Sequence, residues 1–141
     1  MNKLFLTIIL SSISVLSGIV NAQNTDLENW PEGKEPQTVG LLVANRFVES
    51  PHNSFRPPAP PKSITYPEVC AWYGALKFAE VTGNKTLLDQ LEQRFQPFFG
   101  EEKHLIPRPW HVDYSVFGTI PLELYMQTKD KKYFDMGIRF A

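Results

Sequence analysis

Cysteine is almost absent from this sequence of 141 residues, because Cys70 is the only one. A single cysteine excludes an intramolecular disulfide, so the fold must be stabilised by packing. Cys70 lies in the run Val69–Tyr73, which is apolar or aromatic and contains no basic residue to activate a thiol. We therefore expect a buried, unreactive cysteine.

An excess of charge of one sign is also missing. The chain contains 14 Lys and Arg against 15 Asp and Glu, and its formal net charge is -1. This balance argues against nucleic acid or an anionic membrane surface as a partner. Any acidic substrate must be held by local groups.

The motifs of metal and nucleotide chemistry are missing as well. The histidines show no H-E-x-x-H spacing, and there is no G-x-S-x-G elbow, P-loop or dinucleotide fingerprint. We expect neither a metal site nor a cofactor. The histidines in question are His52, His104 and His111.

The first 22 residues have the pattern of a signal peptide. Lys3 precedes an apolar run, and Val20-Asn21-Ala22 places small residues where a signal peptidase cleaves. The alternative is a membrane anchor, but the run is short, is interrupted by serines and lacks a basic flank on its far side. We expect residues 1–22 to be removed, leaving a periplasmic or secreted protein without a membrane segment.

Beyond the signal peptide, residues 23–37 contain Pro and Gly without periodicity and predict a loop. Residues 38–48 show helical spacing, with Thr38 as a possible N-cap and Ser50-Pro51 as the stop. The proline-rich stretch 52–63 predicts a stiff, extended connection.

After residue 65 the apolar residues recur at helical spacing, which predicts two helical hairpins. The first runs from Tyr66 through a turn at 81–84 and ends before Pro97. The second runs from Asp113 through a turn at 128–131, and Gly118 with Pro121 predicts a kink or a delayed start in its first helix. The hairpins superpose at a fixed offset, which takes Thr82 to Thr128, Lys85 to Lys131 and Asp89 to Asp135. Such a repeat predicts an all-α solenoid or α/α toroid.

Asp113 is the candidate functional carboxylate. It could cap the helix that follows it, as aspartate often does. The functional alternative rests on its aromatic neighbours, which are of the kind that stacks on sugar rings: Trp110, His111, Tyr114 and Phe117. In the earlier helix, Trp72 has the spacing of a core residue, whereas Tyr66 stands at the helix entry and is the better candidate for a surface position.

Three runs together resemble the unsaturated rhamnogalacturonyl and glucuronyl hydrolases, glycoside hydrolase families 105 and 88. The most specific is V-D-x-x-V-F-G-x-x-P-L-x-L-Y, and the resemblance covers about residues 38–141. The runs are Thr65–Leu76, Thr82–Asn84 and His111–Tyr125.

This resemblance implies an (α/α)6 barrel, of which residues 38–141 correspond to roughly the first third. It implies hydrolysis of the 4,5-unsaturated uronic acid that lyases leave at the non-reducing end of pectin-type oligosaccharides, by hydration of a vinyl ether. Asp113 matches the first of two important aspartates, and the main acid/base is expected on a later inner helix, beyond Ala141. The expected substrate-binding residues are Tyr66, Trp72, Trp110 and His111.

Two alternatives remain open. One is a non-catalytic helical-repeat remnant that binds carbohydrate or has no activity, which the C-terminus favours because it falls inside an apolar helical run. The other is a different α/α-toroid enzyme, such as a sugar epimerase, which the V-D-x-x-V-F-G run disfavours.

If the barrel is incomplete, apolar helix faces lack partners, because each repeat buries its face on the next. We predict that residues 23–141 alone are of low stability or associate. A sharp, cooperative thermal transition of a monomer, followed by circular dichroism with light scattering, would contradict this prediction.

Overall fold

The computed structural model of this chain describes residues 29–54 and 57–141, so the predicted signal peptide lies outside the described residues. Within these ranges every regular element is helical, which confirms the all-α class. The α-helices are α2 (Pro36–Glu49), α3 (Tyr66–Thr82), α4 (Lys85–Phe95), α5 (Val112–Ser115), α6 (Thr119–Thr128) and α7 (Lys131–Gly137). Short 3-10 turns lie at Gln96–Phe99, Lys103–Leu105, Val116–Gly118 and Ile138–Phe140.

Helix α2 begins two residues before the predicted N-cap Thr38. Pro36 occupies its first turn, where the missing N–H has no intrahelical acceptor and the fixed φ suits a helix. The loop predicted for 23–37 is therefore shorter at its C-terminal end. The helix stops at Ser50, whose backbone is extended, as the following Pro51 predicts.

The turns that join α3 to α4 and α6 to α7 share one geometry. Each begins with a left-handed residue, Gly83 at φ 64° and Lys129 at φ 63°. Each continues with a side chain that accepts a backbone hydrogen bond from the next helix, Asn84 in one turn and Asp130 in the other. The predicted repeat is thus confirmed at these two turns.

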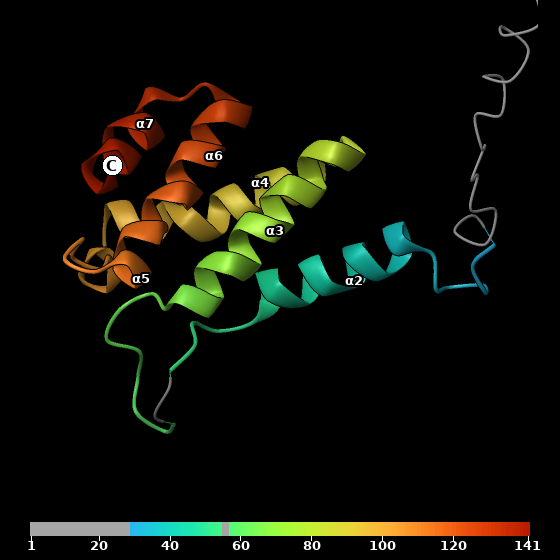
Figure 1. Cartoon of the computed structure of the whole chain (residues 1–141), viewed down its shortest axis with the longest axis horizontal. Helices are drawn as coiled ribbons and strands as arrows, with labels where there is room; N and C mark the ends of the chain where they lie inside the picture. The colour runs from blue at the N-terminus through green and yellow to red at the C-terminus, as the bar shows by residue number, and fades with distance from the viewer. Residues whose placement is uncertain (1–28, 55–56) are drawn as a thin grey trace, which may run out of the picture. The chain divides into compact units, whose positions relative to one another are not determined.

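Helix α3 is the element around which the others pack. It contacts α2, α4 and α6, and α7 packs mainly on α6, as Figure 1 shows. Residues 33–141 form one compact unit built of α2 and the two hairpins. None of the helices in the described ranges is long and apolar enough to cross a membrane.

The long helix predicted from Asp113 is divided in the structure. Helix α5 passes into the 3-10 turn Val116–Gly118, and α6 starts at Thr119. Pro121 then lies in the first turn of α6, where its missing N–H costs little. Of the two forms of the prediction, the delayed helix start is the correct one.

The core is a connected group of aromatic rings centred on Phe95. Its ring centroid lies 5.7 Å from Trp72, 5.1 Å from Phe98, 6.0 Å from Phe117 and 5.7 Å from Tyr133. All five side chains are fully buried. These rings join α3 and α4 to α7 and to the 3-10 turn that follows α5.

Trp72 therefore does not have the substrate-binding role expected for it. Its side chain is 0% exposed, so no ligand reaches its ring. The reason is its position on the stripe of α3 that also buries Val69, Leu76 and Ala79. The core interpretation of Trp72 is the correct one.

Cys70 corrects the expectation of a buried thiol, because its side chain is exposed. It is next to the buried Val69 in sequence, but successive residues of a helix are rotated by about 100°. Cys70 thus shares the open face of α3 with Tyr66 and Tyr73, which are 50% and 41% exposed.

The start of α6 and the end of α7 approach so closely that only glycine fits between them. A Cβ atom added to Gly118 would lie 2.5 Å from Phe140 Cβ and 3.1 Å from the Gly137 carbonyl oxygen. By contrast, a Cβ on Gly74, in the exposed middle of α3, would meet nothing within 4 Å.

We predict that Gly118→Ala lowers the free energy of unfolding by about 1–3 kcal/mol through this overlap. The matched variant Gly74→Ala should raise it by about 0.5–1 kcal/mol, because alanine restricts the unfolded chain. Urea unfolding followed by far-UV circular dichroism measures both. Equal effects of the two variants would contradict the proposed close packing.

Candidate functional site

The candidate site begins at α5, whose N-cap is His111. The Asp113 backbone N–H donates to His111 Nδ1 at 3.2 Å, so the imidazole performs the capping role considered for Asp113. The Asp113 carboxylate lies 3.5 Å from His111 Nδ1, and the two side chains are 60% and 61% exposed. The carboxylate is thus directed to solvent.

The aromatic residues next to Asp113 in the chain contact one another. The Tyr114 ring lies 6.2 Å from Trp110 and 6.3 Å from His111, both nearly edge to face. Trp110 is 73% exposed, which leaves an indole face open for stacking. Phe117, expected in the same cluster, is instead fully buried in the core.

Tyr66 belongs to the same region although it is far away in sequence. It is the first residue of α3, and its side chain is 50% exposed. The neighbouring Cys70 thiol is the main cause that raises the pKa of the Tyr66 hydroxyl, and the negative charge of Asp113 adds a smaller contribution. The charge of Asp113 thus acts on Tyr66, although the two residues are far apart in sequence.

We define the surface cluster as Tyr66, Trp110, His111, Asp113 and Tyr114. The cluster contains four of the five residues expected to bind or convert the substrate, without Trp72, and also Tyr114, which was expected among the aromatic neighbours of Asp113. The cluster offers aromatic faces, an imidazole and a single carboxylate. These groups can stack on a sugar ring and bond its hydroxyls.

A second group of ionisable residues, which sequence reasoning did not find, is centred on Glu68. This carboxylate is 6% exposed and lies in the first turn of α3. Its Oε1 lies 2.5 Å from His52 Nδ1 and accepts from Arg94 at 3.2 Å, and its Oε2 accepts from the Asn53 N–H at 3.1 Å. His52 Nε2 also lies 3.1 Å from Glu102.

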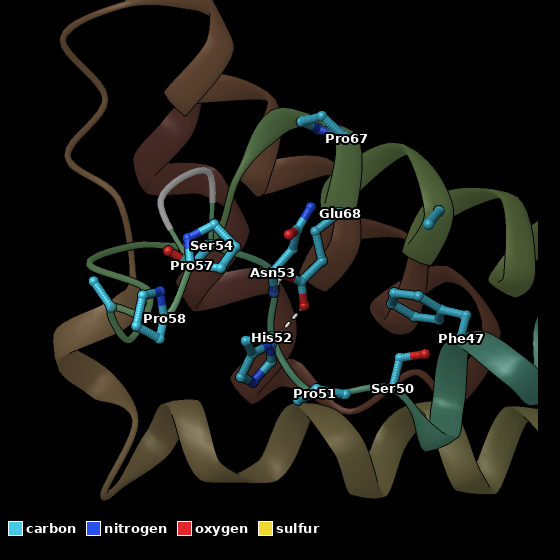
Figure 2. A pocket seen from close by; sticks show the side chains of 12 residues that line it. Phe47, Ser50, Pro51, His52, Asn53, Ser54, Pro57, Pro58, Pro67 and Glu68 are labelled. Carbon is cyan, nitrogen blue, oxygen red and sulfur yellow. Dashed lines mark hydrogen bonds and ion pairs between the residues drawn. The ribbon is translucent and has the colours of Figure 1, made fainter.

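Glu68 and His52 lie on the wall of a cavity of about 490 Å³ whose other lining residues include Pro51, Pro57, Pro58 and Pro67. Figure 2 shows the two side chains facing each other, one from the segment after α2 and the other from α3. Because these charged groups already pair with each other, we interpret them as an anchor for the chain rather than as ligands. A charged residue on the buried stripe of α3, four positions before Trp72, was the signal in the sequence.

The anchor shifts the protonation of both partners. Burial opposes the protonation of His52, but the hydrogen bonds and charges of Glu68 and Glu102 outweigh it and raise the pKa of the imidazole. Burial also opposes the ionisation of Glu68. The bonds from His52 and the Asn53 N–H, with the charges of His52 and Arg94, nevertheless lower its pKa.

No group of three or more His, Cys, Asp or Glu side chains in the described ranges could hold a metal ion. Comparisons with known protein families, with curated proteins and with solved structures found no match to this chain.

The opposite pKa shifts of His52 and Glu68 predict a pH window of stability. A raised histidine pKa gives stability that is complete below the unfolded value of 6.5 and is lost as pH rises through the folded pKa. A lowered glutamate pKa gives stability present above 4.5 and lost as pH falls through the folded pKa. We expect the contribution of the pair to be greatest from about pH 4.5 to pH 6.5.

Glu68→Gln should lower the free energy of unfolding within this window by about 2–3 kcal/mol, because it leaves Arg94 and His52 without their buried anion. It should also flatten the loss of stability as pH rises above about 6.5. Urea unfolding across this range measures both effects. The control is His104→Gln, at an exposed histidine, which should keep the wild-type profile. A wild-type profile in Glu68→Gln would refute the assignment.

Proposed function

We propose that residues 38–141 belong to an (α/α)6-barrel hydrolase that acts on 4,5-unsaturated uronic acids at the non-reducing end of pectin-type oligosaccharides. Support for the barrel comes from the two hairpins with matching turns. The observation that carries the function is the surface cluster, where one exposed carboxylate lies among aromatic side chains. The proposal includes export to the periplasm or the medium.

In this proposal Trp110 stacks on a sugar ring, since its indole is the most exposed aromatic face of the cluster. Asp113 accepts hydrogen bonds from ring hydroxyls, and His111 and Tyr66 supply polar atoms beside it. During hydration, a carboxylic acid protonates the double bond and water adds at the adjacent carbon, giving a hemiketal that releases the neighbouring sugar. The resemblance assigns the proton transfer to a later aspartate and a supporting role to Asp113.

A second candidate is carbohydrate binding without catalysis. The cluster contains a single carboxylate, and its side chains are largely exposed to solvent. A protein that only binds carbohydrate needs no second carboxyl group for proton transfer, and aromatic rings can stack on a sugar at a surface that is open to water. Hydrolysis needs a proton donor and an activated water, so the two candidates differ in what happens to the bound ligand.

We predict that the protein binds unsaturated digalacturonate and that Trp110→Ala or Asp113→Asn weakens binding about tenfold, through lost stacking or lost charge-assisted hydrogen bonds. Calorimetric titration measures the Kd. Asp89→Asn is a matched control, because Asp89 is an exposed aspartate on α4. Unchanged Kd values in both cluster variants would contradict the proposed site.

The ultraviolet absorbance of the unsaturated uronate then separates the two candidates. Its loss on incubation with a full-length protein that includes the later aspartate, slowed about 100-fold by Asp113→Asn, is the result expected for the hydrolase. Binding with stable absorbance would favour the carbohydrate-binding protein instead.

A further inference from the structure

A cavity of about 540 Å³ lies next to the surface cluster. Its walls come from the chain that enters α3, including Pro60, Pro61, Lys62 and Thr65, and from Tyr114 across from it. The volume is within the range of small-molecule sites, about 300–1,000 Å³. Tyr114 belongs both to this wall and to the surface cluster, so the cavity continues the site defined around Asp113.

The charge of this cavity is positive. Lys62 carries the only formal charge among the described residues that line it. The Lys62 ammonium makes no ion pair within the described part of the chain, where the other close charge pairs involve different residues. In a chain of net charge -1, an unpaired ammonium at a cavity favours an anionic ligand locally.

The polar groups of the wall suit a sugar as well as an anion. The rings of Pro60 and Pro61 provide apolar C–H faces. The Thr65 Oγ1 is shielded from solvent, so the hydroxyls that the wall offers to a bound group are those of Ser63 and Tyr114.

We propose that this cavity binds the carboxylate of an acidic sugar unit, with Lys62 as its ion-pairing residue, while the surface cluster stacks on the sugar ring. The inference rests on the proposed function, because it assigns the acidic group of the same ligand to a definite place. Asp113 repels a carboxylate and cannot hold it, whereas Lys62 attracts it. The ligand then spans Tyr114, with one sugar ring against the surface cluster and the carboxylate of the neighbouring unit in the cavity.

The test compares unsaturated digalacturonate with its dimethyl ester, which has the same rings without the negative charges. We expect the wild-type protein to prefer the acid by about tenfold, as one charge-assisted hydrogen bond provides. Lys62→Gln should abolish this preference, and Lys62→Arg should retain it. Lys103→Gln, at another exposed lysine, is the matched control and should bind as the wild type does. Calorimetric titration gives the Kd values, and higher salt should narrow the preference.

The outcomes separate this inference from the proposed function. A Lys62→Gln variant that still prefers the acid overturns the role of the cavity. If Trp110→Ala weakens binding in the same experiment, the proposed function stands without the cavity. Loss of the preference in Lys62→Gln, with no effect of Trp110→Ala or Asp113→Asn, supports the cavity and overturns the role of the surface cluster. Absence of binding of either saccharide to the wild-type protein overturns both.

Discussion

The arrangement of this chain depends on one buried carboxylate. Glu68 cannot stay ionised at 6% exposure without donors, and it obtains them from His52, from the Asn53 backbone and from Arg94. Arg94 also donates to the carbonyls of Val48 at 3.1 Å and Ser50 at 2.6 Å. The end of α2, the start of α3 and the end of α4 are thereby held together by one charge.

This anchor also fixes the proline-rich connection at its first end. At its other end, the fully buried Ile64 donates its N–H to the Leu105 carbonyl at 2.8 Å. Lys62 thus lies two residues before an anchored position, in the described part of the connection that forms much of the 540 Å³ cavity wall. Pro60 and Pro61 restrict the backbone directly before Lys62.

The aromatic core positions the second half of the candidate site. Phe117 is fully buried against Phe95 and Phe98, at 6.0 Å and 5.7 Å between ring centroids. Asp113 precedes Phe117 by four positions and lies at the start of α5, where its side chain is 60% exposed. The core thus holds the segment that follows α5, while the carboxylate stays at the surface.

Helix positions, the two matching turns and the delayed start of α6 could be predicted from the sequence, because capping, proline geometry and apolar spacing act between residues a few positions apart. The same local pattern suggested Asp113 and its aromatic neighbours. The pattern wrongly predicted that Cys70 is buried, that Phe117 belongs to the exposed aromatic cluster, and that Trp72 binds substrate. These predictions failed because the exposure of a side chain depends on which helix face meets a distant element. The ion-pair partners of Glu68 could not be predicted from the sequence, because His52 and Arg94 lie 16 and 26 positions away. The sequence alone therefore determined the helices and their caps, which depend on local interactions, whereas the tertiary structure decided burial and charge pairing, which depend on residues far apart in sequence.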